Sequence, residues 1–202
     1  MQAIVLFVKH PVPGRVKTRL AATIGAERAA EIYRELVERI CRCLPCRTEV
    51  IVMFDPPECG EETARWLRPL CGKARFLPQS GGDLGTRLER AFAEAFALRL
   101  KNVAIIGTDC VEVTSAIFDE AWEALEQGDC AIGPTEDGGY YLIALRQECP
   151  GLFREISWST ERVFAQTIAR ANLLGLSVHV LPRLHDVDTE DDWHRLERRL
   201  PS

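Results

Sequence analysis

The sequence has no long hydrophobic run and no excess of positive charge, and each absence excludes a class of protein. No segment of the 202 residues approaches the roughly eighteen consecutive apolar residues of a membrane helix. The formal net charge is −5, so the chain lacks the basic balance that broad nucleic-acid binding usually needs. The first apolar run, AIVLFV, is too short for a signal peptide and follows no cationic stretch. These absences predict a cytoplasmic protein without membrane or nucleic-acid partners.

The sequence also lacks an evident second cysteine or histidine pair to complete a zinc site. Three of the eight cysteines lie in the segment CRCLPC, residues 41–46. A structural zinc ion usually needs four ligands, often supplied as two close pairs. The segment is therefore interpreted as a helix end with incidental thiols, with a zinc site as the alternative. In a cytoplasmic chain the cysteines are expected to be reduced.

What the sequence does contain is an alternation of short apolar runs with amphipathic stretches. This alternation predicts an α/β fold with a largely parallel sheet. The absence of linkers, repeats and low-complexity segments predicts one domain over residues 1–202. Strands are expected at residues 3–8, 49–54, 74–78, 103–107, 129–133, 140–145 and 177–181, and helices at 26–43, 60–70, 83–99, 114–127, 160–175 and 189–199.

The segment PVPGRVKTRL, residues 11–20, gathers cations beside a glycine turn directly after the first predicted strand. In open α/β sheets, ligands collect at the carboxyl ends of strands. Gly14 would let the backbone approach a ligand, and a helix beginning near Val16 would offer free N–H groups. Lys17 and Arg19 would add charges that suit phosphate. The segment matches neither the P-loop nor G-x-G-x-x-G. It is either a phosphate-binding loop or a solvated loop.

Acidic residues are expected at the same edge of the sheet. Asp109 follows the strand predicted at 103–107, and the segment HDVDTEDDW supplies Asp186 and Asp188. Carboxylate oxygens suit a hard divalent cation, which would screen a diphosphate. The alternative is capping: Asp109 would cap the following turn, and the late aspartates would form a capping box for the last helix. Different carboxylates can serve the two purposes.

Two further loops are rich in glycine. In QSGGDLGTRL, residues 79–88, Asp83 is suited to cap the next helix, while the glycines would let a flat base lie against the backbone. Between two predicted strands, Asp137-Gly138-Gly139 is a standard hairpin signal. A hairpin explains the glycines, but it does not explain Glu136 and Asp137 beside two tyrosines.

Six motifs follow one another in order: FVKHPVPGRVKTRL, PQSGGDLGTRLERAF, IIGTDC, GPTEDGGYYLIAL, ISWST and DVDTEDD. This set resembles a bacterial family of small transferases in the GT-A glycosyltransferase superfamily, of the arsenosugar-biosynthesis and radical-SAM-selenium-associated types. The resemblance extends from Ile4 to Trp193. More distantly, the chain is similar to phospholactate and molybdenum-cofactor guanylyltransferases. The resemblance implies a three-layer α/β/α sandwich with a mixed, mostly parallel sheet, the nucleotide-diphospho-sugar transferase fold.

The resemblance also implies a role for each motif, although Val111 stands where the family usually has proline. It places Gly14, Lys17 and Arg19 at the nucleotide phosphates, and Asp109 and Asp188 at a metal site. The base and ribose would lie near Gln79, Asp83 and Gly85, and the sugar or acceptor near Glu136, Asp137, Gly138, Gly139 and Trp158.

These roles imply a metal-dependent glycosyltransferase that moves a sugar from a nucleotide-diphospho-sugar donor to a small-molecule acceptor. Mg²⁺ or Mn²⁺ on Asp109 and Asp188 would stabilise the leaving diphosphate, with Lys17 and Arg19 on its other side. Asp137 would orient or deprotonate the acceptor hydroxyl. The alternative is a guanylyltransferase-like nucleotidyltransferase that releases pyrophosphate, and a third interpretation is a nucleotide-sensing module without activity. The sequence does not predict the donor, the acceptor or the oligomeric state.

Overall fold

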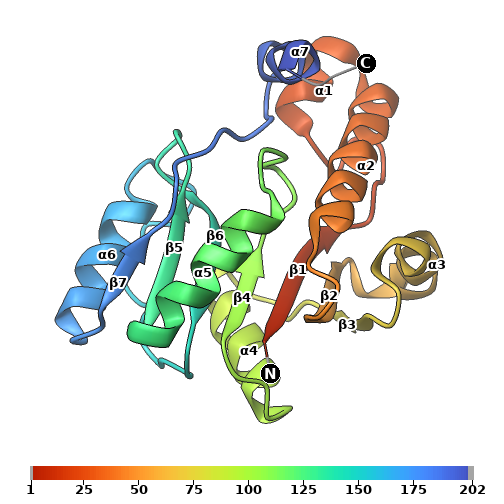
Figure 1. Ribbon diagram of the computed structural model, residues 1–202. Helices are drawn as coiled ribbons and strands as arrows, with labels where there is room; N and C mark the ends of the chain where they lie inside the picture. The colour runs from red at the N-terminus through yellow and green to blue at the C-terminus, as the bar shows by residue number, and fades with distance from the viewer. Residues whose placement is uncertain (1, 200–202) are drawn as a thin grey trace.

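The computed structural model describes residues 2–199 and contains a seven-stranded sheet with helices on both faces (Figure 1). The strand order is β3-β2-β1-β4-β6-β5-β7. Four neighbouring pairs are parallel, while β6 runs antiparallel to both β4 and β5. The sheet is therefore mixed and mostly parallel, as predicted. The strands are β1 (Ala3–Lys9), β2 (Glu49–Asp55), β3 (Arg75–Pro78), β4 (Val103–Ile106), β5 (Cys130–Pro134), β6 (Tyr140–Leu145) and β7 (Val178–Val180).

The helices form two layers because alternate residues of each central strand point to opposite faces. On one face, Ile4 and Leu6 of β1 pack in a cluster with α2, α3 and α5. On the other face, Ala3 and Val5 pack in a cluster with α4 and α6. This arrangement confirms the three-layer sandwich. The helices are α1 (Thr18–Ile24), α2 (Ala26–Cys43), α3 (Gly60–Cys71), α4 (Leu84–Ala97), α5 (Ser115–Gln127), α6 (Val163–Leu173) and α7 (Glu190–Arg199), with a 3₁₀ turn at Pro57–Cys59.

The first helix differs from the prediction. It begins at Thr18 rather than near Val16, and it contains only seven residues. Val16 is instead buried in the core, and Lys17 precedes the helix in a left-handed conformation with φ 45°. The helix start that was predicted near Val16, with its free N–H groups, therefore lies at Thr18.

The CRCLPC segment includes the end of α2, as the preferred interpretation predicted. Helix α2 ends at Cys43, and Leu44 follows it in an extended conformation. The buried Cys41 is directed toward α3, where its Sγ lies 3.2 Å from Sγ of Cys71. The thiol at position 41 therefore contributes to the contact between two helices.

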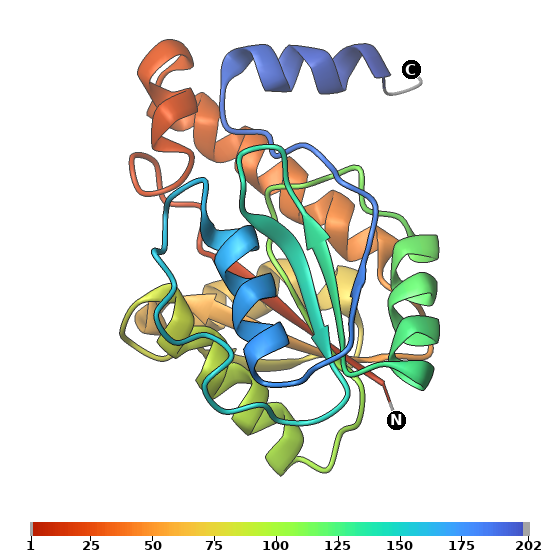
Figure 2. The ribbon, with the colours of Figure 1, turned by 90° about the vertical axis from the view of Figure 1, so that its left-hand side faces the viewer.

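Residues 181–189, here called the C-terminal strap, connect β7 to α7 and lie against two other loops. Leu184 exchanges backbone hydrogen bonds with the β5–β6 turn, and Val187 N donates to Asp109 O at 2.9 Å after β4. Thr189 and Asp192 form the predicted capping box of α7, with Thr189 N donating to Asp192 Oδ2 at 2.9 Å. Helix α7 packs beside α1 and α2 (Figure 2). Capping by Asp192 leaves the Asp188 carboxylate available to the site described below.

Within residues 2–199, no helix has both the length and the apolar character that crossing a membrane requires.

Candidate active site

A cleft with a volume of about 970 Å³ opens at the carboxyl-terminal edge of β1 and β4. Segments far apart in the sequence line it: the ends of both strands, the loop before α1, the first turn of α4, the β5–β6 turn, the loop before α6 and the C-terminal strap. Ligand pockets commonly occupy roughly 300–1,000 Å³. The cleft therefore has room for a nucleotide-sized molecule, at the edge where the sequence predicted a ligand.

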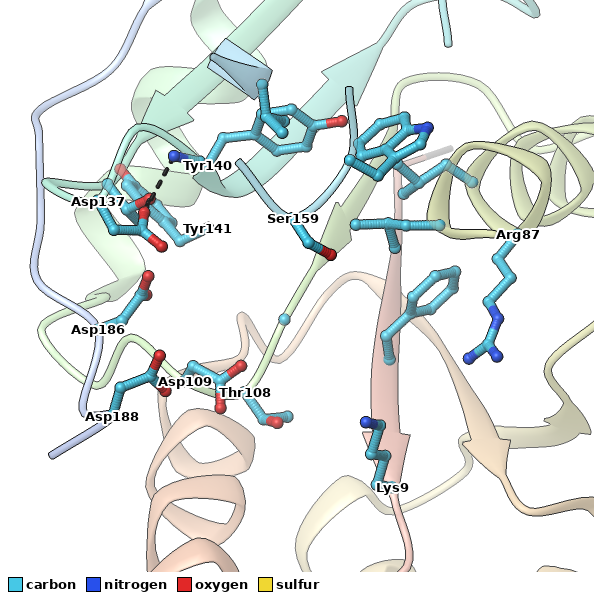
Figure 3. A pocket seen from close by; sticks show the side chains of 18 of the residues that line it. Lys9, Arg87, Thr108, Asp109, Asp137, Tyr140, Tyr141, Ser159, Asp186 and Asp188 are labelled. Carbon is cyan, nitrogen blue, oxygen red and sulfur yellow. Dashed lines mark hydrogen bonds between the residues drawn. The ribbon is translucent and has the colours of Figure 1, made fainter. Parts of the chain in front are cut away.

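Charge divides this cleft into two sides (Figure 3). Lys9 lies at the end of β1 and is exposed, while Arg87 projects from α4. The guanidinium of Arg87 is fixed in part by Gly82, whose carbonyl accepts from Arg87 Nε at 3.1 Å. The side opposite these cations carries four aspartates: Asp109, Asp137, Asp186 and Asp188.

Lys17 lies among these aspartates and forms ion pairs with two of them. Its Nζ is 3.0 Å from Asp188 Oδ1 and is in close contact with Asp109 Oδ1. The side chain is only 4% exposed. Burial alone would lower the pKa of Lys17, but the two carboxylates outweigh burial and raise it. Lys17 is therefore a buried and charged cation that Asp109 and Asp188 share.

Arg19, in contrast, lies at the rim of the cleft. Its side chain is 78% exposed, and its Nη1 is 3.6 Å from Asp188 Oδ2. An ion pair at this distance and exposure is weak because water screens it. The guanidinium can therefore turn toward an incoming anion at little cost.

Asp186 lies beside the Lys17 ion pairs and has a strongly raised pKa. Burial is the largest cause, and the negative charges of Asp109, Asp137 and Asp188 add to it, so the pKa rises from 3.8 to about 7. Lys17 opposes this rise only in part. The acidic side of the cleft thus carries more negative charge than Lys17 neutralises.

This raised pKa predicts that the metal-free protein loses stability as the pH rises from about 4 to about 7. The folded protein binds the Asp186 proton more tightly than the unfolded chain does, so protonation stabilises the fold until the pH passes the folded pKa. We expect a loss on the order of 4 kcal/mol. Urea unfolding in chelator should show this slope in the wild type and in the surface variant Asp191→Asn, but much less of it in Asp186→Asn. An equal slope in all three proteins would contradict the prediction.

Tyr33 of α2 lies in the wall of the cleft and is not among the site residues predicted from the sequence. Its hydroxyl accepts a hydrogen bond from Lys9 N at 2.8 Å and another from Thr108 Oγ1 at 3.2 Å. Burial raises the pKa of Tyr33, which therefore remains protonated. In the sequence, Tyr33 shares the helical spacing of apolar core positions such as Ile32 and Leu36. Nothing in that pattern distinguishes it from a packing residue.

Four residues that were expected at the ligand do not line the cleft: Gly14, Gly85, Glu136 and Gly138. At Gly85, an added Cβ would lie 2.6 Å from Nε1 of Trp158, so the glycine leaves room for the indole rather than for a base. At Gly138, an added Cβ would lie 2.1 Å from the carbonyl oxygen of Glu161. Close packing within the protein accounts for both of these glycines.

Glu136 and Gly14 serve the structure of the loops around the cleft. Glu136 Oε1 lies 2.9 Å from His185 Nε2, and the second ring nitrogen of His185 is 3.2 Å from Glu112 Oε2. This bridge connects the β5–β6 turn, the loop after β4 and the C-terminal strap. Gly14 has φ +79° with open space around the position of a Cβ, so its backbone conformation alone favours glycine.

The remaining predicted residues do line the cleft, but several of them already form hydrogen bonds within the protein. Gln79 Nε2 donates to Met53 O at 2.9 Å, which ties the loop after β3 to the end of β2. Asp83 caps α4, as predicted, by accepting from Thr86 N at 2.8 Å. The residues in the wall are Lys17, Arg19, Gln79, Asp83, Asp109, Asp137, Gly139, Trp158 and Asp188.

Asp137 is held by the turn that carries it. Its Oδ1 accepts from Thr135 Oγ1 at 2.5 Å and from Gly139 N at 2.9 Å. Strands β5 and β6 pair in antiparallel fashion around this turn, which confirms the predicted hairpin. The turn thus fixes one carboxylate oxygen of Asp137 at the wall of the cleft.

The loop before α6 brings Ser159 to the cleft. The helix predicted from residue 160 begins only at Val163 in α6. Ser159 instead has a left-handed backbone with φ 63°, and its side chain points into the cleft (Figure 3). Beside it, Thr160 Oγ1 donates to Ser157 O at 2.7 Å, so a local turn positions this part of the wall.

The sheet order, the layers and the cleft define an α/β protein with the fold of nucleotide-diphospho-sugar transferases. Residues 41–160 match the family described as "Uncharacterized protein conserved in bacteria (DUF2064)", and the chain belongs to this family. A search of curated proteins gives no significant match.

Solved structures show the same fold. A Desulfovibrio desulfuricans G20 protein, described as a "putative nucleotide-diphospho-sugar transferase", is 34% identical with a TM-score of 0.91, over 98% of this chain and 86% of that chain. A cytidylyltransferase from Leptospira borgpetersenii is 15% identical with a TM-score of 0.63, over 100% and 88%. Mycobacterium tuberculosis Rv0371c in complex with manganese is 14% identical with a TM-score of 0.53, over 99% and 100%. At the two lower identities, the likeness establishes the fold alone.

Proposed function

We propose that this protein is a divalent-metal-dependent glycosyltransferase that uses a nucleotide-diphospho-sugar donor and a small-molecule acceptor. One observation carries the proposal: Asp109 and Asp188 share a cation, the Lys17 ammonium, in a cleft at the carboxyl edge of the central strands. The likeness to the Desulfovibrio protein, whose description names this class of donor, supports it. A transferase is the function that this fold and this charge distribution suit best.

The residues present fit Mg²⁺ or Mn²⁺. Within residues 2–199, no three His, Cys, Asp or Glu side chains are placed to hold a metal ion by themselves. Asp109 and Asp188 nevertheless direct their Oδ1 atoms to one position, and Mg²⁺ is typically held by one or two carboxylates together with substrate phosphates and water. When bound, the metal would offset the negative charge of the diphosphate.

The chain's own residues would supply the remaining chemistry. Arg19, exposed at the rim, would bind the diphosphate and offset the charge that develops on it as the bond to the sugar breaks. Asp137 would accept the proton of the acceptor hydroxyl, whose oxygen forms the new bond to the sugar carbon. The nucleoside diphosphate is the leaving group. Trp158 and Ser159, which also line the cleft, would contact the sugar or the acceptor.

Residues 1–202 would act as a single domain in the cytoplasm. The association with arsenosugar biosynthesis or with radical-SAM selenium genes stays a prediction from the sequence motifs. Nucleotidyl transfer is the competing function, because the fold neighbours include a cytidylyltransferase.

A two-part experiment distinguishes glycosyl from nucleotidyl transfer. In a thermal-shift screen with Mn²⁺, we expect a nucleoside diphosphate or nucleotide-sugar to raise the melting temperature by about 5 °C or more at saturation, because a ligand that binds only the folded state stabilises it. In a pyrophosphate assay, the four common nucleoside triphosphates, offered with sugar phosphates or phospholactate, should release none.

The control for the thermal-shift screen is the same screen in chelator, where the rise in melting temperature should disappear. Metal-dependent pyrophosphate release that is lost in Asp109→Asn would establish nucleotidyl transfer instead. The absence of a shift with every nucleotide would reject both transfer functions.

A further inference from the structure

Lys17 occupies a conformation that the chain adopts only with support from its surroundings. Its φ of 45° and ψ of 49° place it in the left-handed region, which is unfavourable for an L-residue. Its ammonium is also removed from water, with 4% of the side chain exposed. Both costs are offset by the pairing of one ammonium with two carboxylates. The backbone at position 17 is thus arranged to deliver a cation to this pair.

The ammonium of Lys17 lies between the carboxylates of Asp109 and Asp188. Lys17 Nζ meets Oδ1 of Asp109 and Oδ1 of Asp188, which is the position that the proposed function assigns to a metal. Asp188 Oδ2 lies 3.6 Å from Nη1 of Arg19, so Lys17 and Arg19 approach different oxygens of this carboxylate. Two cations cannot share one position between the same two oxygens because their charges repel. A divalent ion held by both Oδ1 atoms therefore requires Lys17 to leave.

We propose that Lys17 is a built-in counter-ion that occupies the metal position of the free protein and is displaced when the metal binds. This inference rests on the proposed function, since it assumes that a divalent cation binds Asp109 and Asp188. The displaced ammonium lies in the same cleft as Arg19 and can pair with the diphosphate of the donor. Metal and diphosphate then bind cooperatively, and the metal alone binds weakly.

The main test measures Mn²⁺ affinity by calorimetry in the absence of nucleotide. Lys17→Met keeps the aliphatic stem and removes the charge, and we expect it to bind Mn²⁺ at least tenfold more tightly than the wild type. Lys9→Met is the matched control: it removes the same charge from the opposite side of the cleft, away from the aspartates. Its affinity should change less than threefold. Circular dichroism establishes whether each variant is folded.

A second measurement uses the wild type, so that the inference stays testable if Lys17→Met does not fold. Amine labelling followed by peptide mass spectrometry should show slow modification of Lys17 in chelator and at least fivefold faster modification with saturating Mn²⁺. Labelling of Lys9 should change little. Accelerated labelling at Lys17 alone supports displacement.

The outcomes separate this inference from the function on which it rests. If the wild type binds Mn²⁺ and folded Lys17→Met binds it equally or more weakly, Lys17 is not a competing counter-ion and the inference is overturned. Labelling of Lys17 that Mn²⁺ leaves unchanged overturns it as well. If neither the wild type nor the variant binds Mn²⁺ even when a nucleoside diphosphate is present, the metal site itself is rejected, and the proposed function fails together with the inference.

Discussion

The Asp109→Asn protein is expected to keep the wild-type fold and to bind a nucleoside diphosphate with Mn²⁺ at least a hundredfold more weakly. The change replaces a carboxylate oxygen in contact with Lys17 by a neutral amide group of similar size. Carboxylate oxygens are strong ligands for hard divalent cations, whereas an amide contributes no charge. The fold should persist because Asp109 is anchored to the C-terminal strap through its backbone carbonyl, which accepts from Val187 N.

Calorimetric titration with Mn²⁺ and a nucleoside diphosphate measures this loss. Asp119→Asn is the matched control, since it makes the same chemical change on the exposed surface of α5, outside the cleft. It should bind like the wild type. Wild-type affinity in a folded Asp109→Asn protein would remove Asp109 from the metal site.

The Gly138→Ala protein is expected to lose about 4 kcal/mol or more of its free energy of unfolding. Gly138 has φ +89°, and an added Cβ would stand 2.1 Å from the backbone oxygen of Glu161. A backbone atom cannot rotate out of the way as a flexible side chain can. In the native structure, Phe164 N donates to Gly138 O at 2.8 Å, so the turn and the beginning of α6 would have to separate.

Gly175→Ala separates the two causes of this loss. Gly175 also has a positive φ, +70°, but among the described residues no heavy atom beyond its chain neighbours lies within 4 Å of an added Cβ. Its substitution should cost only about 1–2 kcal/mol, the strain of the left-handed backbone. Urea unfolding of both variants gives the comparison. Equal losses would show that the turn at Gly138 moves aside without further cost.

The sequence predicted the layers of this fold well because burial leaves a local pattern. A run such as residues 3–8 has apolar side chains at every position, and both sets of alternate residues are buried against helices. Helix α2 was predicted over its full length for a similar reason, since its apolar positions repeat on one face. In both cases the information lies within a few neighbouring residues.

The site was harder to predict because its contacts join distant residues. Lys17 and Asp188 are separated by 171 positions. The sequence suggested that Lys17 binds phosphate, whereas the structure places its ammonium on two carboxylates. Gly85 was expected beside a base, whereas it packs against Trp158. These two residues are far apart in the sequence, so the residues around Gly85 do not indicate the contact. Residue type indicated the chemistry available, but not the partner.

The C-terminal strap has a consequence for the way this protein is made. On the ribosome, all seven strands are synthesised before residues 181–189, so the sheet can pair while Asp186 and Asp188 have yet to be translated. At that stage Asp109 has been synthesised and Asp188 has not, so Lys17 can form one of its two ion pairs. The acidic side of the cleft is thus completed among the last steps of synthesis. A chain released just before the strap would retain all seven strands and lack two of the four aspartates on the acidic side of the cleft, so we expect premature termination to give an inactive protein rather than a partly active one.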